Sequence, residues 1–487
     1  MAAIATPAER FRGNDRVLYG IILGVITFWL FAQTTLNIAP DMGRDLHLGA
    51  STMNTAVAIT ALFSGIFIVV IGGLADRVGR VRIVRIGFYL SIVGSLLVGL
   101  APAGRWASSL LLTGRALQGL SGACIMPASL ALVKTYWDGA ARQRAVSLWS
   151  IGSWGGSGVC ALFGGVVAQS LGWRYIFFAS VVVALLGLVL MSGTPESRAT
   201  DKATYRFDFA GVVTFMVAMV SLQIVVTQGN KLGWHSLPVL ILIAVALVTG
   251  ALFVRVETRT SSAFVDFSLF SNSTYTGATI SNFLLNAAAG TLIVSLELVQ
   301  LGGKLTAKQA GMLTLGYAVA IIAFIRVGEK LLQHFGARKP MVWGCVITGL
   351  SILFLSPANL LLKDYRILAV IAYTLYGVGL AFYATPSTDA ALSNLPESQA
   401  GAGSGIYKMA SSLGAAFGVA ISATIFTALS SGTDSARWVE GVITFYGRQD
   451  NVAVRAAAMI ALMFNVFMVA VAILSIMLTI PSGKKAH

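Results

Sequence analysis

Fourteen runs of about 20 apolar residues occur along the 487-residue chain, each long enough to cross a lipid bilayer as a helix. They occupy roughly 17–39, 53–75, 83–103, 107–132, 145–168, 174–193, 209–227, 238–256, 274–299, 310–327, 341–357, 366–389, 404–429 and 456–480. Charged residues make up only 11% of the chain, against about 25% in a soluble domain. This pattern excludes a soluble enzyme and a disordered chain. It predicts an all-α integral membrane protein with fourteen transmembrane helices.

The positive charge is distributed unevenly between the two sides of these spans. The 34 Lys and Arg residues outnumber the 19 Asp and Glu residues, which gives a net charge of +15. An even number of spans places both termini on one side, and the loops there hold 22 of the basic residues, against 11 on the other side. Because basic residues favour the cytoplasmic side, we expect residues 1–16 and 481–487 to be cytoplasmic tails. The charge therefore marks topology, and we expect no nucleic-acid partner.

Short segments of the chain repeat at nearly the same spacing. The loop after the second span contains Gly79, and the loop after the tenth contains Gly336, 257 residues later. Pro127 in the fourth span and Pro386 in the twelfth are 259 residues apart. The glycine-rich fifth and thirteenth spans keep the same offset of eight spans. Internal repeats around a site near the membrane midplane are typical of secondary transporters.

An offset of eight spans fits two six-helix bundles separated by two inserted helices. The predicted boundaries are 17–193 for the N-terminal bundle, 194–273 for a linker with the two extra helices, and 274–480 for the C-terminal bundle. The inserted spans contain mostly Val, Leu, Ile and Ala. We therefore expect them to lie at the periphery of the molecule.

Residues 72–82 read GGLADRVGRVR and resemble the loop signature of the major facilitator superfamily, G-x-L-A-D-R-x-G-R-[KR]. Glycine permits a tight turn and a close helix approach, and a carboxylate accepts hydrogen bonds from an arginine or from a helix N-terminus. The alternative is a loop that is basic only because it is cytoplasmic. The resemblance implies a conformational latch on the cytoplasmic side, made of Gly72, Asp76, Arg77, Gly79 and Arg80.

The fourth span carries a positive charge inside the predicted membrane region. Arg115 precedes Gln118 in a stretch similar to the R-x-x-Q-G motif of the same superfamily, in which this arginine is associated with proton coupling. A charged side chain inside a membrane is costly and is a functional candidate by default. Glu297, near the outer end of the ninth span, is the second candidate and could pair with Arg115. In the alternative interpretation, each of these side chains reaches the membrane interface.

The fifth span and the WRYIF stretch after it are similar to the fourteen-helix drug:proton antiporter branch of the superfamily, and the resemblance covers nearly the whole chain. Small residues at every fourth position favour close helix packing. The residues assigned to this packing are Gly152, Gly156, Gly164 and Gly165.

The chain departs from the pattern of the antiporter branch at two places. Cys160 and Ala161 stand where that branch has Gly-Pro, and Ala32 stands where its first span has an aspartate. A proton-coupled exporter of cations uses a buried carboxylate as proton carrier and counter-ion. These departures leave open a facilitator or a symporter for an anionic or neutral metabolite.

Polar side chains inside the spans are candidates for the wall of a substrate cavity. Asn282 and Asn286 lie one helical turn apart and would share a face. Any of these side chains could equally form a hydrogen bond between helices. At the cytoplasmic ends, Glu329 and Asp389 are expected in salt bridges of a gate. The cavity candidates are Gln33, Thr34, Gln118, Asn282, Asn286, Tyr373, Tyr376, Tyr383 and Lys408.

The sequence thus predicts a secondary active transporter, with proton-coupled export of hydrophobic or amphipathic small molecules by alternating access. The scattered cysteines and histidines form no catalytic or metal-binding pattern, so we expect no enzyme activity, no cofactor and no metal. The expected partners are a small-molecule substrate, protons and the lipid bilayer. We expect a monomer in the inner membrane of a bacterial cell.

Overall fold

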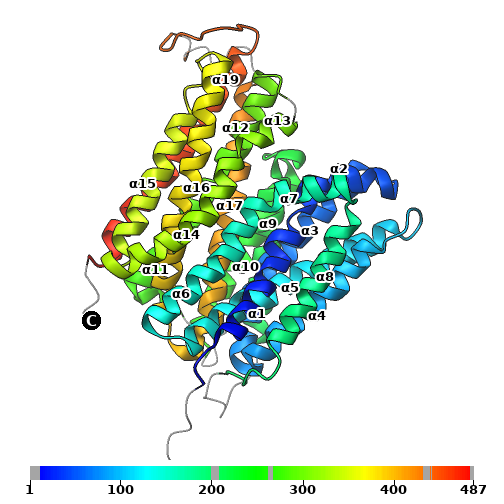
Figure 1. The fold of residues 1–487 in the computed structure, drawn as a ribbon, viewed down its shortest axis with the longest axis vertical. Helices are drawn as coiled ribbons and strands as arrows, with labels where there is room; N and C mark the ends of the chain where they lie inside the picture. Colours follow the sequence, from blue (N-terminus) through cyan, green and yellow to red (C-terminus); the bar gives the residue numbers. More distant parts are fainter. Residues whose placement is uncertain are drawn as a thin grey trace, which may run out of the picture.

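The computed structural model describes residues 11–198, 208–260, 267–305, 307–430, 439 and 441–482, and every regular element in these ranges is a helix. Most residues of the two predicted tails lie outside the described residues. The first half of the chain contains α1 (Asp15–Ile26), the π-helix η1 (Thr27–Ala32), α2 (Thr35–Leu46), α3 (Ala50–Val78), α4 (Arg80–Gly99), α5 (Ala107–Tyr136), α6 (Gly139–Ser150), the π-helix η2 (Ile151–Gly155), α7 (Gly156–Ser170) and α8 (Arg174–Leu190) (Figure 1).

The remaining elements begin with a hairpin of two helices, α9 (Phe209–Leu232) and α10 (Leu237–Glu257). They are followed by the second half: η3 (Phe267–Ser271), α11 (Ser273–Ala287), α12 (Gly290–Glu297), the π-helix η4 (Leu298–Gly302), α13 (Ala307–Leu313), α14 (Leu315–Phe335), α15 (Arg338–Leu355), α16 (Leu362–Ser393), η5 (Glu397–Gln399), α17 (Ala400–Ser430) and α19 (Val452–Thr479).

In the described part of the chain, twelve helical segments are long and apolar enough to cross a membrane. A thirteenth is added if the bent pair Gly139–Cys160 and Leu162–Ser170 counts as one span, and α8 is a shorter apolar helix of 17 residues. The structure therefore supports a helical membrane protein. The number of described helices that are long enough to span a membrane is smaller than the fourteen expected from the sequence. The two differ at the bent fifth span and at the short sixth.

The two halves use the same local devices at matching places. Gly79 joins α3 to α4 with a φ of +129°, and Gly336 joins α14 to α15 with a φ of +73°. Glycine adopts such backbone angles without the steric cost that a Cβ imposes. Pro127 and Pro386 lie inside the long helices α5 and α16. These correspondences are the structural counterpart of the sequence repeat.

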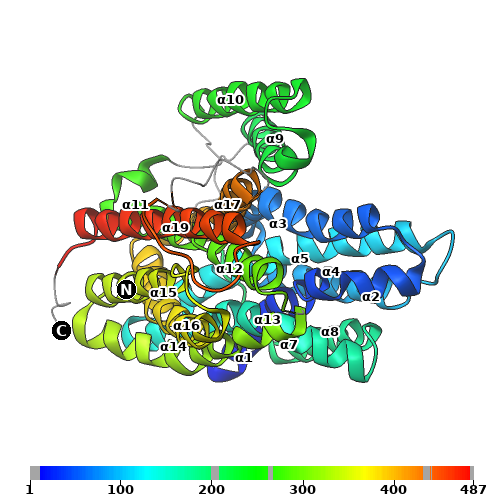
Figure 2. The same ribbon diagram turned by 90° about the horizontal axis from the view of Figure 1, so that it is seen from above.

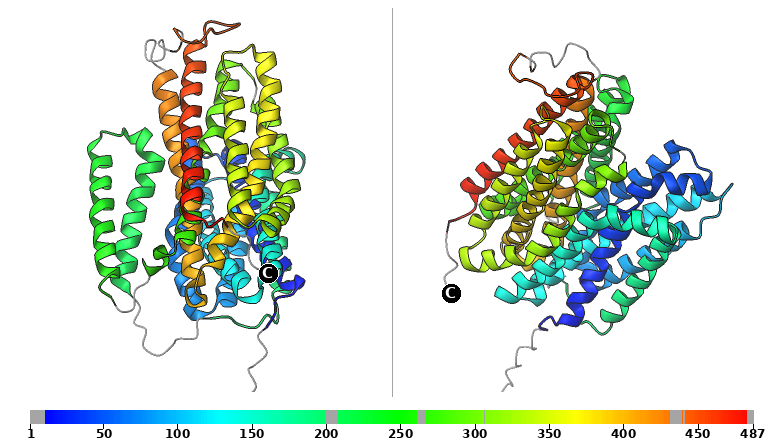
Figure 3. Two further views of the ribbon diagram at one scale, coloured as in Figure 1. Left: turned by 90° about the vertical axis from the view of Figure 1, so that its left-hand side faces the viewer. Right: turned by 45° about the horizontal axis from the view of Figure 1, so that its top comes forward.

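Each half packs as a bundle, and the two bundles lie side by side (Figure 3). In the first half, α5 packs against α3 and α4, and α8 packs against α1 and α4. In the second half, α16 packs between α14 and α15, and α19 packs against α11, α15 and α17. The halves meet where α3 and α5 contact α17, and where α6 contacts α14 and α16.

The hairpin of α9 and α10 lies outside the two bundles (Figure 2). Helix α9 contacts α3 and α17, whereas only 6% of the α10 span is buried inside the protein. The exposed side chains of α10 include Leu237, Leu240, Ile241 and Leu247. A helix that is apolar all round and uncovered by protein is suited to contact lipid.

Candidate functional site

A cavity of about 160 Å³ lies between the two halves. In the first half, its wall comes from η1, η2 and α7, and in the second half from α11, α12, α14, α16 and α17. Ligand sites in helical membrane transporters lie at such a junction. The lining residues are Trp29, Ser153, Trp154, Ser157, Leu285, Asn286, Ala289, Leu292, Tyr317, Tyr376, Leu380, Lys408, Ser411, Ser412 and Ala415.

Local helix geometry explains how these side chains come to face one space. Lys408, Ser411, Ser412 and Ala415 follow the spacing i, i+3, i+4 and i+7, which places them on one face of α17. Trp29 belongs to η1, and Ser153 and Trp154 belong to η2. Short π-helical segments are frequent at functional sites because they shift the direction of the following side chains.

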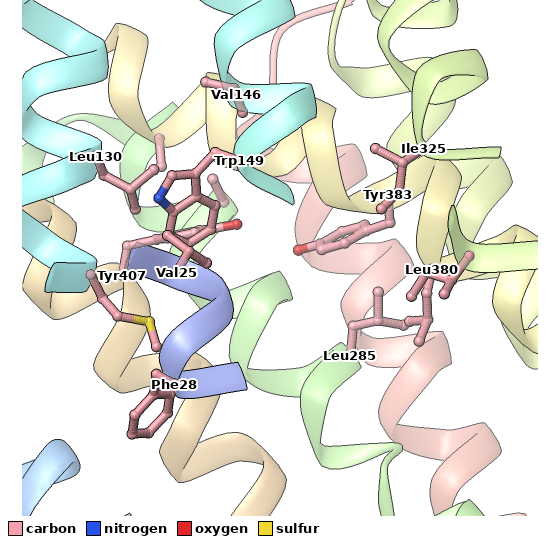
Figure 4. Packing of buried hydrophobic residues seen from close by; sticks show 14 of the residues in the cluster. Val25, Phe28, Leu130, Val146, Trp149, Leu285, Ile325, Leu380, Tyr383 and Tyr407 are labelled. Carbon is pink, nitrogen blue, oxygen red and sulfur yellow. The ribbon is translucent and has the colours of Figure 1, made fainter. Parts of the chain in front are cut away.

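Lys408 is the charged residue of the cavity wall, and its side chain is 3% exposed. Its Nζ lies 4.7 Å from the centre of the Trp149 ring and 6.0 Å from that of Tyr407. Trp149 and Tyr407 belong to the buried cluster shown in Figure 4. The Trp149 Nε1–H donates to Ser129 Oγ at 2.9 Å. This bond orients the indole ring so that its face meets the ammonium group, a favourable cation–π geometry.

Hydrogen bonds hold the other polar side chains of the wall. The Tyr376 hydroxyl donates to the carbonyl of Ala288 at 3.1 Å, and its ring meets the edge of Tyr317 with 5.6 Å between ring centres. Asn286 Nδ2 donates to Asn282 Oδ1 at 2.9 Å, so the two asparagines share a helix face as expected. These contacts leave aromatic surface facing the cavity.

Several predicted cavity residues lie outside the lining and connect helices instead. The Thr34 hydroxyl donates to the Cys160 carbonyl at 3.0 Å. Asn282 Nδ2 donates to the Tyr407 carbonyl at 2.9 Å. The Tyr373 and Tyr383 hydroxyls bond Ser295 and Ser281 on neighbouring helices, at 2.6 and 2.8 Å. In this structure the polar atoms of these four residues are used in packing, and their placement on a substrate cavity wall stays a prediction. Gln33 is half-buried and also lies outside the lining.

Arg115 is 1% exposed and lies inside the first bundle. Its guanidinium donates to the carbonyls of Ala56 and Ala32, at 3.0 and 2.8 Å, and to Gln118 Oε1 at 2.6 Å. The alternative in which Arg115 reaches the membrane interface is therefore wrong. Gln118, which also donates to Ser95 Oγ at 3.1 Å, supports the arginine and does not line the cavity.

Glu297 lies at the end of α12 and is half-buried. Its pairing with Arg115 is not formed in this structure, since the guanidinium of Arg115 bonds groups of its own bundle. Glu297 is also absent from the lining of the cavity. The proton-coupling role of both residues stays a prediction.

Asp76 connects the two halves at the terminal end, by which we mean the end where α1 begins and α19 ends. Its carboxylate accepts from Arg80 Nε at 2.9 Å and Nη2 at 2.7 Å. It also accepts from the backbone N–H groups of Gly401 and Ala402, at 2.9 and 3.0 Å. These two donors are at the N-terminus of α17, where backbone N–H groups lack helical partners. Asp76 thus has both kinds of partner considered from the sequence.

The other residues assigned to the latch differ in how closely they approach the second half or neighbouring side chains. A Cβ on Gly72 would lie 2.5 Å from the Gly401 carbonyl oxygen, so glycine permits the backbones of α3 and α17 to touch. A Cβ on Gly79 would lie 2.5 Å from the Glu196 carboxyl carbon. Arg77 is half-buried at the end of α3.

A second ionic contact joins the halves at the terminal end. Arg142 on α6 donates from Nε to Asp389 Oδ1 on α16 at 3.1 Å, and from Nη2 to Ser393 Oγ at 2.8 Å. Asp389 thus lies in a salt bridge between the halves, whereas Glu329 pairs with Arg326 on its own helix. Because its salt bridge lies within α14, the expectation of a gate contact for Glu329 stays a prediction.

The small residues of the fifth span face the first transmembrane segment. A Cβ on Gly152 would lie 3.4 Å from Ile22, and one on Gly156 would lie 3.3 Å from the Trp29 side chain. A Cβ on Gly164 would overlap the Thr34 side chain. A Cβ on Gly165 would meet nothing within 4 Å, so its assignment to helix packing is wrong.

Sequence reasoning missed several residues of the site. Glu196 accepts from the backbone N–H groups of Val81 and Arg82, at 2.9 and 3.0 Å, and caps the start of α4. No local pattern announces this contact, because Glu196 is more than 100 residues away. The face of α17 that begins at Lys408 could have been found from its helical spacing.

The arrangement defines a class of protein: a helical membrane protein whose two bundles enclose a cavity and close together at one end. The family model of the Major Facilitator Superfamily matches residues 21–419 and 274–484. The chain belongs to the major facilitator superfamily. It is therefore a secondary transporter of the cell membrane and not an enzyme.

Curated relatives and solved structures agree with this assignment. The chain is 48% identical over 426 residues to the quinolone resistance protein NorB of Staphylococcus aureus strain MRSA252, covering 88% of this chain and 91% of the relative. NorB of strain MW2 is 48% identical over 428 residues, with the same coverage.

Two solved structures share the fold. The proton:xylose symporter XylE has a TM-score of 0.62 at 15% identity and covers 96% of this chain and 95% of its own. The human organic anion transporter MFSD10 has a TM-score of 0.61 at 14% identity, with coverages of 95% and 98%.

Proposed function

We propose that this protein exports amphipathic aromatic small molecules, including drugs, in exchange for protons. The observation that carries the proposal is the cavity between the halves, whose wall combines Trp29, Trp154, Tyr317 and Tyr376 with a few polar groups. Flat aromatic surfaces with few fixed polar partners suit amphipathic ligands of varied shape. The relatives named for quinolone resistance support the same class of substrate.

The proposed mechanism is alternating access of the cavity to the two sides of the membrane. In the topology we propose, fourteen helices span the membrane and both termini are cytoplasmic. The bent fifth span and α8, whose 17 residues extend for about 25 Å, complete the fourteen. The excess of basic residues in the loops on the side of the termini supports this orientation. The contacts of Asp76 and Arg142 then close the cytoplasmic side.

In the proposed mechanism, proton coupling uses groups outside the cavity wall. None of the described residues that line the cavity is acidic. Arg115 and Glu297 remain our candidates, with Arg115 acting through its bonds to the first helix. The second candidate function is a facilitator or symporter for an anionic or neutral metabolite, which Ala32 and Lys408 favour.

Transport into proteoliposomes separates these functions. A pH gradient is imposed, and a fluorescent quinolone and the lumenal pH are followed together, with Arg115→Ala as the matched variant. Antiport predicts that substrate movement and proton movement occur in opposite directions and that both are lost in the variant. Substrate flux that ignores the gradient would reject proton coupling and favour the facilitator.

A further inference from the structure

We propose that Lys408 is the counter-charge for an anionic group of the substrate, so that the cavity selects aromatic carboxylates over monocations. This inference rests on the proposed export through the same cavity and names the chemical class that the site prefers. Among the described residues that line the cavity, Lys408 is the basic one and none is acidic.

Lys408 contributes to the cavity wall and has no acidic partner in the described part of the chain. Lys408 is only 3% exposed. Within the described ranges, the recorded contacts of its Nζ are the rings of Trp149 and Tyr407, and no carboxylate forms a salt bridge with it. Aromatic faces stabilise a cation without neutralising it. A buried cation held in this way gains from a carboxylate that enters the cavity.

The rest of the wall fits the remainder of such a ligand. Ser411 and Ser412 lie on the same helical face as Lys408, and their hydroxyl groups can donate to a second carboxylate oxygen. Trp29 and Trp154 from the first half and the tyrosines from the second half offer flat surfaces on which an aromatic ring can stack. A carboxylate attached to a planar ring system therefore meets a complementary group at each end.

A monocation faces the opposite balance of charges. It enters a cavity that already holds one positive charge, and like charges repel strongly where water is scarce. The two acidic residues that join the halves, Asp76 and Asp389, already have partners at the terminal end. A cation thus finds no compensating carboxylate among the described residues of the wall.

The test compares three probes and three proteins. The probes are a quinolone acid without a basic substituent, its neutral methyl ester, and the monocation tetraphenylphosphonium. The proteins are the unmodified chain, Lys408→Met and Lys408→Arg, with Lys363→Met as a control at an exposed lysine of α16. Equilibrium binding to detergent-purified protein is measured by quenching of tryptophan fluorescence, and export is measured separately in proteoliposomes.

We expect the unmodified protein to bind the acid at least 10-fold more tightly than the ester or the monocation. A hydrogen bond to a charged group corresponds to about a 10- to 100-fold change in affinity. Lys408→Met should lose this factor for the acid and change ester binding less than 3-fold, whereas Lys408→Arg and the control should keep the preference.

The outcomes separate this inference from the proposed export. Equal affinity for acid and ester in the unmodified protein, with both exported, overturns the role of Lys408 and leaves the export intact. Tight binding of the monocation also overturns it. Selective binding of the acid without export of any probe supports the role of Lys408 and rejects the proposed function.

Discussion

Replacing Asp76 by asparagine should weaken the contact that joins the two halves at the terminal end. The asparagine keeps one oxygen for the Gly401 N–H, but its NH₂ group faces the Ala402 N–H, so a donor meets a donor. The lost bond to a charged acceptor is worth about 1.5 to 3 kcal/mol. The lost attraction to the N-terminus of α17 adds about 0.5 to 1 kcal/mol.

These terms act on the equilibrium between two conformations of the transporter. The bonds of Asp76 to Gly401 and Ala402 join the halves, whereas its pair with Arg80 stays within the first half. Only the former depend on closure. A loss of about 2 to 4 kcal/mol corresponds to a shift of about 30- to 1,000-fold toward the form that is open at the terminal end.

A cysteine reporter measures this shift. The three native cysteines, Cys124, Cys160 and Cys345, are replaced by alanine, and Ala402, which is 6% exposed, is replaced by cysteine. Where opening precedes reaction, the labelling rate with a small maleimide follows the population of the open form. We expect Asp76→Asn to raise this rate at least 30-fold.

The control is Asp364→Asn, which removes the same charge from an exposed position at the other end of α16. It should leave the labelling rate unchanged. If Asp76→Asn also labels at the original rate in folded protein, the contact does not close the molecule. A separate loss of substrate affinity would instead place Asp76 in the binding site.

Four further substitutions test other contacts. Gly164→Ala should lower the stability of the protein by about 1 to 3 kcal/mol, because its Cβ would overlap the first helix. Gly165→Ala should change the stability by no more than about 0.5 kcal/mol. Thermal unfolding in detergent compares the two variants, and equal melting temperatures would contradict the packing at Gly164. Arg115→Ala should abolish coupled transport in vesicles without preventing membrane insertion, and full activity would refute its role. Gly401→Ala should separate α3 from α17 and raise maleimide labelling, because its Cβ would contact the Gly72 carbonyl; an unchanged rate would argue against a tight junction.

The class of fold could be predicted from the sequence because membrane spans obey simple physical limits. Apolar length and the side preference of basic residues act on each segment by itself. The repeat also has a local cause, since the positive φ of Gly79 and Gly336 demands glycine at matching turns. Such features depend on residues that are close in sequence.

The cavity was harder to predict because polar side chains inside a membrane have two uses. Asn286 and Tyr376 line the cavity, whereas Asn282 and Tyr373, of the same residue types, bond neighbouring helices. Sequence alone does not state the rotation of each helix about its axis. Trp149 on α6, whose ring contacts Lys408 on α17, likewise meets its partner only through tertiary packing and carried no signal of its own.

The inserted hairpin makes the two flanks of the transporter unequal. Among the described helices, α9 packs on α3 and α17, which contact each other on one side of the junction between the halves, while α6 and α14 contact each other on another side. An amphipathic molecule that has dissolved in the acyl chains therefore meets α9 and α10 on the side of α3 and α17. We therefore expect a molecule that enters the cavity from the lipid to approach on the side of α6 and α14.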